Sequence, residues 1–193
     1  ARGQVISFFL DWKHGTETLE TALNAHLPAD IAVQAAEEVP LAFHPRYDAL
    51  SRTYRYQLYA QMARNPLVDR FSWRLNVMPD LEKMNRAAEL LLGEHDFRAF
   101  GKALKEDATT VRKIFSAEWQ GDGQQAAFTI CGNAFLYHMV RQIVFVLVQV
   151  GLGNLPEEIV SRGLESGETG IVSLAPARGL TLLEVAYPEN AMK

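Results

Sequence analysis

Residues 134–150 read Ala-Phe-Leu-Tyr-His-Met-Val-Arg-Gln-Ile-Val-Phe-Val-Leu-Val-Gln-Val, a segment that is apolar on nearly every side of a helix. A helix with apolar residues all round is typical of a protein core. The β-branched residues within it leave a buried strand as the lesser alternative. Its longest uninterrupted apolar run, Ile143 to Val148, is too short for a membrane span, which needs about 20 apolar residues. We therefore expect a helix at the centre of a globular domain.

The strands expected around this helix are short and separated by turn residues. Residues 51–59 alternate, which places Tyr54 and Tyr56 on one face of a strand and Arg55 on the other. Residues 111–119 and 125–131 flank a Gly-Asp-Gly turn and predict a hairpin. Further strands are predicted at residues 5–10, 31–36 and 180–187.

Shorter helices complete the predicted fold. Pro79 and Asp80 precede apolar residues at helical spacing and Gly93 follows them, so a helix is expected in between. Others are expected after Gly15 and from Pro156. The pattern predicts the α+β class, with a mixed, mainly antiparallel sheet and helices packed on one face. Because no long linker or repeat interrupts it, residues 1–193 are expected to form a single compact domain.

The composition is that of an ordinary folded protein, with 193 residues, 48% of them hydrophobic and 22% charged. A net charge of -4 excludes a strongly basic protein that coats nucleic acid, but a local patch could still bind RNA. Cys131 is the only cysteine, which excludes an intramolecular disulfide and favours a reducing cytoplasm. The five histidines are scattered singly and no Gly-rich phosphate loop is present, so phosphoryl transfer and zinc hydrolysis have no support in the sequence, and no metal site is predicted.

One arginine is out of place in this pattern. Arg141 lies within the most apolar segment of the chain. A guanidinium cannot shed its charge, and removing one member of a buried ion pair costs about 3 to 5 kcal/mol. Arg141 should therefore face a fixed carboxylate or phosphate. A structural ion pair with Asp48 or Asp96 is one explanation, and a functional site is the other.

Arginines and tyrosines are interleaved over residues 43–56, with a single aspartate among them. Arginines can hold phosphates while a tyrosine face stacks on an unstacked base. A half-buried strand with solvated arginines is an equally good explanation of the pattern. The arginines of this stretch that are predicted to bind RNA are Arg46, Arg52 and Arg55.

A second basic stretch covers residues 98–113. It contains five basic residues against two acids, Glu106 and Asp107, whereas the end of the chain is acidic. This asymmetry permits a polyanion on one face, although such a charge run is more often a solvated surface. The residues of this stretch that are predicted to bind RNA are Arg98, Lys102 and Arg112.

Six blocks, in order, resemble the tRNA pseudouridine synthase A family. They are Gly3-Gln4-Val5, Leu27-Pro28-Ala29-Asp30-Ile31-Ala32-Val33, residues 43–56 ending in Tyr-Arg-Tyr, residues 92–97, residues 133–141, and Ala175-Pro176-Ala177-Arg178-Gly179-Leu180. The resemblance implies isomerisation of uridine to pseudouridine in the anticodon stem-loop of tRNA, by a homodimer without a cofactor. It also implies roles for three residues. Tyr54 matches the stacking residue, Arg141 the arginine that pairs with a catalytic aspartate, and Leu180 an apolar residue of the uracil pocket.

The catalytic aspartate of the family lies in a segment that reads Gly-Arg-Thr-Asp-Ala-Gly-Val-His. This segment is absent from the 193 residues and would come just before Ala1. The resemblance therefore implies the C-terminal two-thirds of a synthase, without the first part of its fold and inactive alone. The alternative is a non-catalytic RNA-binding module, and an enzyme for a small molecule would need a nucleophile that the sequence does not offer.

Overall fold

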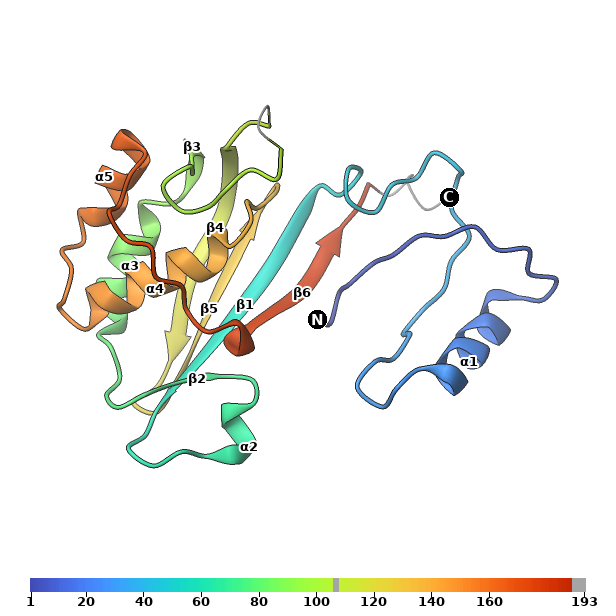
Figure 1. The fold of residues 1–193 in the computed structure, drawn as a ribbon, viewed down its shortest axis with the longest axis horizontal. Helices are drawn as coiled ribbons and strands as arrows, with labels where there is room; N and C mark the ends of the chain where they lie inside the picture. Colours follow the sequence, from blue (N-terminus) through green and yellow to red (C-terminus); the bar gives the residue numbers. More distant parts are fainter. Residues whose placement is uncertain (106–107, 189–193) are drawn as a thin grey trace. The chain divides into compact units, whose positions relative to one another are not determined.

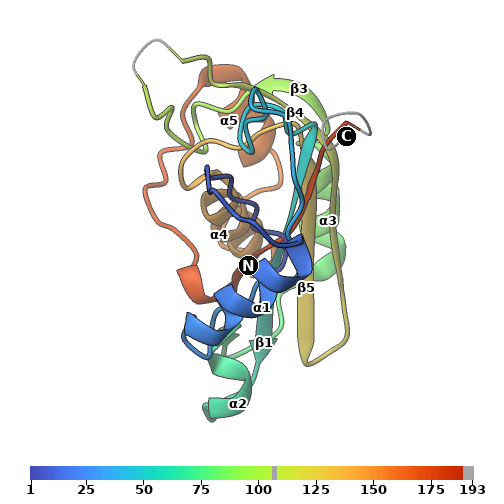
Figure 2. The ribbon, with the colours of Figure 1, turned by 90° about the vertical axis from the view of Figure 1, so that its right-hand side faces the viewer.

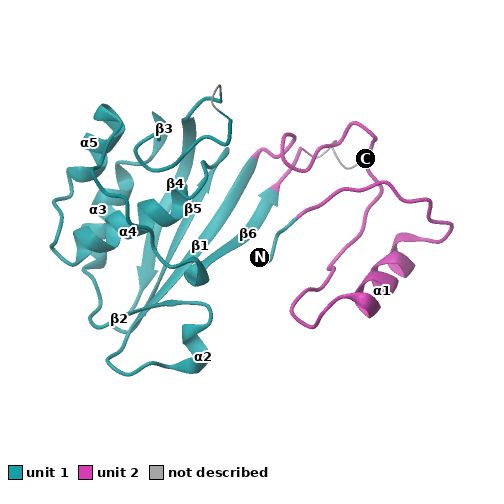
Figure 3. Cartoon of the chain, in the orientation of Figure 1, with its two compact units in different colours: residues 1–4, 51–185 teal, residues 5–50, 186–193 magenta. Residues whose placement is uncertain are grey.

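The computed structural model describes residues 1–105 and 108–188, so Glu106 and Asp107 of the second basic stretch lie outside the described residues. The chain forms two compact units, which Figure 3 shows in different colours. The larger unit comprises residues 1–4 and 51–185, and the smaller one comprises residues 5–50 and 186–193.

A mixed sheet is the framework of the larger unit (Figure 1). Within the described residues it has six strands: β1 (Ser51–Ala60), β2 (Trp73–Leu75), β3 (Gly93–Asp96), β4 (Val111–Gly121), β5 (Gln125–Gly132) and β6 (Leu180–Ala186). Their order is β2-β1-β5-β4-β3, and β6 also pairs with β1. The β1–β5, β5–β4 and β4–β3 pairs are antiparallel, whereas β1 and β2 run parallel. The predicted α+β class and the predicted hairpin are confirmed.

The alternation predicted for β1 decides which side chains enter the core. Tyr56 lies opposite Phe128 of β5 in the register, and both are fully buried. Arg55 lies opposite Thr129 on the other face and is exposed. A strand puts successive side chains on opposite faces, so Tyr54 shares the core-facing side with Tyr56.

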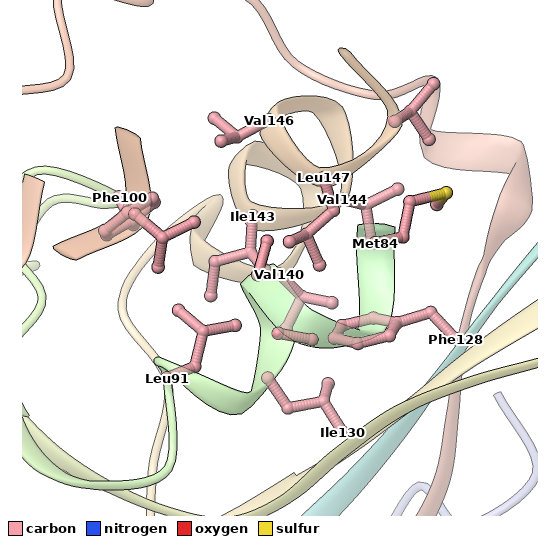
Figure 4. Close-up of a cluster of buried hydrophobic side chains, with 14 of the residues drawn as sticks. Met84, Leu91, Phe100, Phe128, Ile130, Val140, Ile143, Val144, Val146 and Leu147 are labelled. Atoms are coloured by element: carbon pink, nitrogen blue, oxygen red, sulfur yellow. The ribbon is translucent and has the colours of Figure 1, made fainter. Parts of the chain in front are cut away.

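The helices supply the rest of the core. They are α2 (Pro66–Asp69), α3 (Leu81–Glu89), α4 (Met139–Gly151), α5 (Ile159–Ser166) and a 3-10 turn, η1 (Ala177–Gly179). Asp80 caps α3 as its spacing predicts, because its Oδ1 accepts hydrogen bonds from the backbone N–H groups of Glu82 and Lys83. Figure 2 shows α4 running alongside the sheet, and Figure 4 shows Met84 of α3 and Ile143 of α4 in one cluster with Phe128 of β5.

The central helix begins later than its apolar pattern predicts. It starts at Met139, five residues after Ala134, because His138 has a left-handed backbone conformation with φ of 65°. Such a conformation cannot be part of a right-handed helix. Residues 133–138 therefore form a connecting segment between β5 and α4.

The smaller unit contains α1 (Thr16–His26) as its regular element among the described residues. The strands predicted at residues 5–10 and 31–36 are wrong, since both stretches have irregular structure. In residues 31–36, side chains of α1 form hydrogen bonds with backbone groups that would pair with a neighbouring strand in a sheet. Asn24 both donates to the carbonyl of Val33 (3.0 Å) and accepts from its N–H (2.8 Å), and Glu20 accepts from the N–H of Ala36 (2.8 Å).

Within the described part of the chain, none of the helices is long and apolar enough to cross a membrane.

Candidate functional site

Arg141 lies in the first turn of α4, where its side chain is half-buried. Its Nε–H donates to the carbonyl oxygen of Ala175 over 2.7 Å, and the backbone N–H of Ala175 donates back to the carbonyl of Arg141 over 3.1 Å. Among the described residues of the larger unit, no carboxylate forms an ion pair with Arg141. Asp96, one of the partners considered from the sequence, instead accepts from the Thr110 hydroxyl and the Arg98 backbone N–H.

This arrangement leaves the forked end of Arg141 available for a ligand. The Nε–H is already used, which fixes the plane of the guanidinium. A planar guanidinium binds a carboxylate or a phosphate through two parallel hydrogen bonds. The remaining N–H groups of Arg141 can bind an anion in this way.

Tyr56, on β1 of the sheet, binds the residue that follows Ala175. Its hydroxyl donates to the carbonyl oxygen of Pro176 over 2.8 Å. Burial raises the pKa of this phenol, while the positive charges of Arg141 and Arg178 act in the opposite direction.

Gly179 allows the chain to pass directly over the Tyr56 ring. A Cβ atom added at Gly179 would lie 2.6 Å from Cζ of Tyr56 and 2.9 Å from the carbonyl oxygen of Gln57. Contacts this short do not occur with real side chains, so only glycine fits. Leu180 follows as the first residue of β6 and packs, partly buried, against the core. Residues 175–180 are thus held between α4 and β1.

A polar network next to these residues was not predicted from the sequence. Arg178 forms an ion pair with Asp69 of α2 at 3.3 Å, and the hydroxyl of Tyr59 donates to the same carboxylate over 3.1 Å. The missed signal is Asn65-Pro66. Asn65 accepts a hydrogen bond from the backbone N–H of Leu67, and proline at the first helical position is typical of a helix start.

Tyr54 lies one pleat along β1 from Tyr56, at the segment that connects β5 to α4. Its ring meets Phe135 edge to face, with ring centroids 5.1 Å apart. Burial raises its pKa, and the charge of Arg52 opposes this. The Arg52 guanidinium donates to the carbonyl oxygen of Asn133 over 2.9 Å, so both residues border residues 133–138.

The residues predicted to bind RNA are only partly brought together. Lys102 pairs with Tyr137 through two backbone hydrogen bonds, so Lys102 and Arg52 both flank residues 133–138. Arg55 lies on the opposite face of β1 from Tyr54. Arg46 belongs to the smaller unit, where its guanidinium lies 6.0 Å from the centre of the Tyr47 ring.

The two remaining arginines contact the chain around β3 and β4. Arg98 forms an ion pair with Asp96 at 3.6 Å and contacts the carbonyl of Ser166. Arg112 donates to the carbonyls of Thr109 and Val111. The described residues contain no group of three or more His, Cys, Asp and Glu side chains that could hold a metal ion.

Comparison with known proteins identifies the family of the chain. A family model described as tRNA pseudouridine synthase matches residues 87–188, which include α4 and residues 175–180. The class defined by the match is that of the pseudouridine synthases.

Relatives that match nearly all of this chain show which family of pseudouridine synthases it belongs to. Proteins named tRNA pseudouridine synthase A from Syntrophotalea carbinolica and Geobacter sp. strain M21 are 41% and 40% identical to this chain. The matches cover 100% and 98% of this chain and 77% of each relative. The protein of the same name from Francisella tularensis subsp. novicida is 36% identical over 100% of this chain and 75% of its own length. The chain belongs to the tRNA pseudouridine synthase A family, which confirms the resemblance found in the sequence.

Proposed function

We propose that this chain forms one side of the active site of an enzyme that converts uridine to pseudouridine in the anticodon stem-loop of tRNA. The observation that carries the proposal is the orientation of Arg141. Its Nε–H is fixed by Ala175, and among the described residues of the larger unit no carboxylate pairs with its forked end. The names of the relatives, which are tRNA pseudouridine synthases, supply the substrate and the reaction.

The reaction sets the demands on the site. The bond between ribose C1′ and uracil N1 breaks, C1′ then bonds to C5 of the same uracil, the C5 proton leaves, and N1 takes up a proton. A carboxylate near C1′ is needed, and the base must be held outside the helical stack while it turns. In this proposal, Arg141 positions the carboxylate, Tyr54 stacks on the base, and Leu180 forms an apolar wall of the uracil pocket.

The carboxylate itself is proposed to lie outside these 193 residues. The family segment Gly-Arg-Thr-Asp-Ala-Gly-Val-His does not occur in the sequence. If the carboxylate lies outside these residues, Arg141 should have no carboxylate partner among the described residues of the larger unit, as is observed. The chain alone should then bind tRNA without modifying it.

The basic residues have the proposed task of holding phosphates. Arg52 and Lys102 border the segment that contacts Tyr54, and they are placed to hold the phosphates nearest the base. Four further arginines are proposed to contact other phosphates of the tRNA: Arg46, Arg55, Arg98 and Arg112. We also expect the enzyme to work as a homodimer in the cytoplasm.

The test is pseudouridine formation on a tRNA transcript. A longer protein that carries the aspartate segment ahead of Ala1 should form pseudouridine, and the 193-residue chain should not. A tRNA-binding protein without activity in either form would instead support the alternative function, a non-catalytic RNA-binding module. The absence of a carboxylate partner for Arg141 among the described residues of the larger unit is the observation that keeps this alternative open.

A further inference from the structure

We infer that the neighbouring rings of Tyr137 and His138 form a second stacking surface, which receives an unpaired base of the tRNA next to the modified uridine. This inference rests on the proposed function, because it names RNA as the ligand. It concerns a different pair of residues from Tyr54. Their ring centroids lie 3.7 Å apart with an angle of 26° between the planes, so the two rings are stacked.

Hydrogen bonds order the backbone that carries this pair. The N–H of Tyr137 donates to the carbonyl of Lys102 over 3.0 Å, and the N–H of Lys102 donates to the carbonyl of Tyr137 over 3.2 Å. Gly101 packs closely against the same segment, since a Cβ atom there would lie 2.8 Å from Cβ of Leu136 and 3.0 Å from the carbonyl oxygen of Tyr137. His138 has its φ fixed at 65° by the turn into α4. A surface that is already ordered loses little conformational entropy when it binds.

Tyr137 is exposed, and His138 is partly exposed. Tyr137 keeps 54% of its surface accessible, whereas Leu136 beside it is 6% exposed. The His138 side chain precedes α4 without forming a capping hydrogen bond. Tyrosine is enriched at binding surfaces because it combines an apolar ring with a polar hydroxyl.

The surroundings favour RNA as the ligand. Lys102, whose backbone is hydrogen-bonded to that of Tyr137, has an exposed side chain. The Arg52 side chain donates a hydrogen bond to the carbonyl oxygen of Asn133, at the other end of residues 133–138. Phe135, two residues before Tyr137, contacts the ring of Tyr54. Aromatic rings between cationic side chains are how proteins bind unpaired nucleotides, with bases on the rings and phosphates on the charges.

The experiment measures binding of tRNA transcript to the 193-residue chain by fluorescence anisotropy, over a range of salt concentrations. Tyr137→Leu keeps an apolar side chain but removes the aromatic face, and Tyr137→Phe keeps the face. Since stacking contributes about 1 to 3 kcal/mol per base, Tyr137→Leu should weaken binding about 5- to 150-fold, and Tyr137→Phe should bind like the parent. The slope of log K against log salt should be unchanged in both variants.

Three further measurements separate stacking from charge and from folding. His138→Asn keeps a residue that tolerates the left-handed conformation but removes the ring, and it should also weaken binding. Lys102→Ala should reduce the salt slope by about 0.7 to 0.9, as expected for one lost phosphate contact. A fully paired RNA hairpin closed by a non-nucleotide linker should bind Tyr137→Leu and the parent equally well, because it offers no unpaired base.

The outcomes for the inference and for the proposed function can be told apart. If Tyr137→Leu binds tRNA as tightly as the parent while Arg52→Ala weakens binding and lowers the salt slope, the stacking surface is wrong and the proposed function stands. If the parent chain does not bind tRNA, both are wrong. A loss that is the same for tRNA and for the paired hairpin also overturns the inference, because it would show a general effect on the surface.

Discussion

The hydroxyl of Tyr56 on β1 donates a hydrogen bond to the carbonyl oxygen of Pro176, 120 residues further along the chain, over 2.8 Å. Arg141 reaches the neighbouring carbonyl, that of Ala175, over 2.7 Å. Two consecutive carbonyls are therefore held by a strand and by a helix. Because Leu180 begins the strand that follows, these two hydrogen bonds set the position of the proposed uracil wall relative to Arg141.

Removing the Tyr56 hydroxyl should destabilise the larger unit. Tyr56→Phe removes the shorter of two hydrogen bonds to the Pro176 carbonyl, which also accepts from the N–H of Gly179 over 3.4 Å, and one hydrogen bond contributes about 0.5 to 1.5 kcal/mol. The free energy of unfolding, measured with urea, should fall by that amount. Tyr47→Phe is the matched control, because Tyr47 is 69% exposed and a surface substitution should change stability by less than about 0.5 kcal/mol. Equal effects of the two substitutions would contradict the role given to Tyr56.

The same tyrosine should make the protein sensitive to alkali. Burial raises the pKa of Tyr56, more than the two nearby arginines lower it. In the unfolded chain a tyrosine ionises near pH 10, so above about pH 10 the unfolded state releases a proton that the folded state retains. The contribution of Tyr56 to stability is therefore complete below that pH and is lost as the pH rises above it. Urea midpoints at about pH 8 and about pH 10.5 should fall less for Tyr56→Phe than for the parent. Identical declines would show that Tyr56 does not titrate in this way.

Gly179 should not tolerate even a methyl group. Its added Cβ would overlap the Tyr56 ring, and Gly179→Ala should lower the free energy of unfolding by about 1 to 3 kcal/mol, as overpacking usually does. The control is Gly123→Ala, since a Cβ atom at Gly123 would meet nothing within 4 Å. If thermal unfolding shows Gly179→Ala to be as stable as Gly123→Ala, the close approach of residues 175–180 to β1 is wrong.

The sequence predicts the elements whose patterns depend only on local chemistry. The alternation of β1, the hairpin of β4 and β5, and the capped helix α3 are all confirmed. Each carries its own signal, either a two-residue period, a turn between two strands, or an aspartate and a proline before an apolar run.

Other features depend on partners distant in the sequence and could not be predicted. Residues 31–36 have the composition of a strand, yet Asn24 and Glu20 of α1 occupy their backbone groups. The start of α4 depends on the backbone angle of His138, which the apolar pattern does not reveal. For Arg141, burial among apolar residues predicted a charged partner, and the structure adds a backbone carbonyl that fixes its Nε–H.

Tyr54 should contribute to RNA affinity through its ring and not through charge. Tyr54→Ala should weaken tRNA binding about 5- to 150-fold, because loss of a stacking face costs about 1 to 3 kcal/mol per base, and the salt slope should stay the same. Replacing Arg46 and Arg55 together should reduce the salt slope by about 0.7 to 0.9 per lost phosphate contact. A salt titration by filter binding measures both quantities. If all slopes are equal and Tyr54→Ala binds like the parent, these residues are only a solvated surface.

The central claim is that Arg141 positions a catalytic carboxylate, and pseudouridine formation tests it most directly. The measurement is tritium release from tRNA labelled at C5 of uridine, with a longer protein that carries the aspartate segment. Arg141→Lys keeps the charge but loses the planar fork and the bond to Ala175, and it should lower turnover by about 10² or more while tRNA affinity changes little. Turnover by Arg141→Lys at the rate of the parent, or robust turnover by the 193-residue chain alone, would contradict the account.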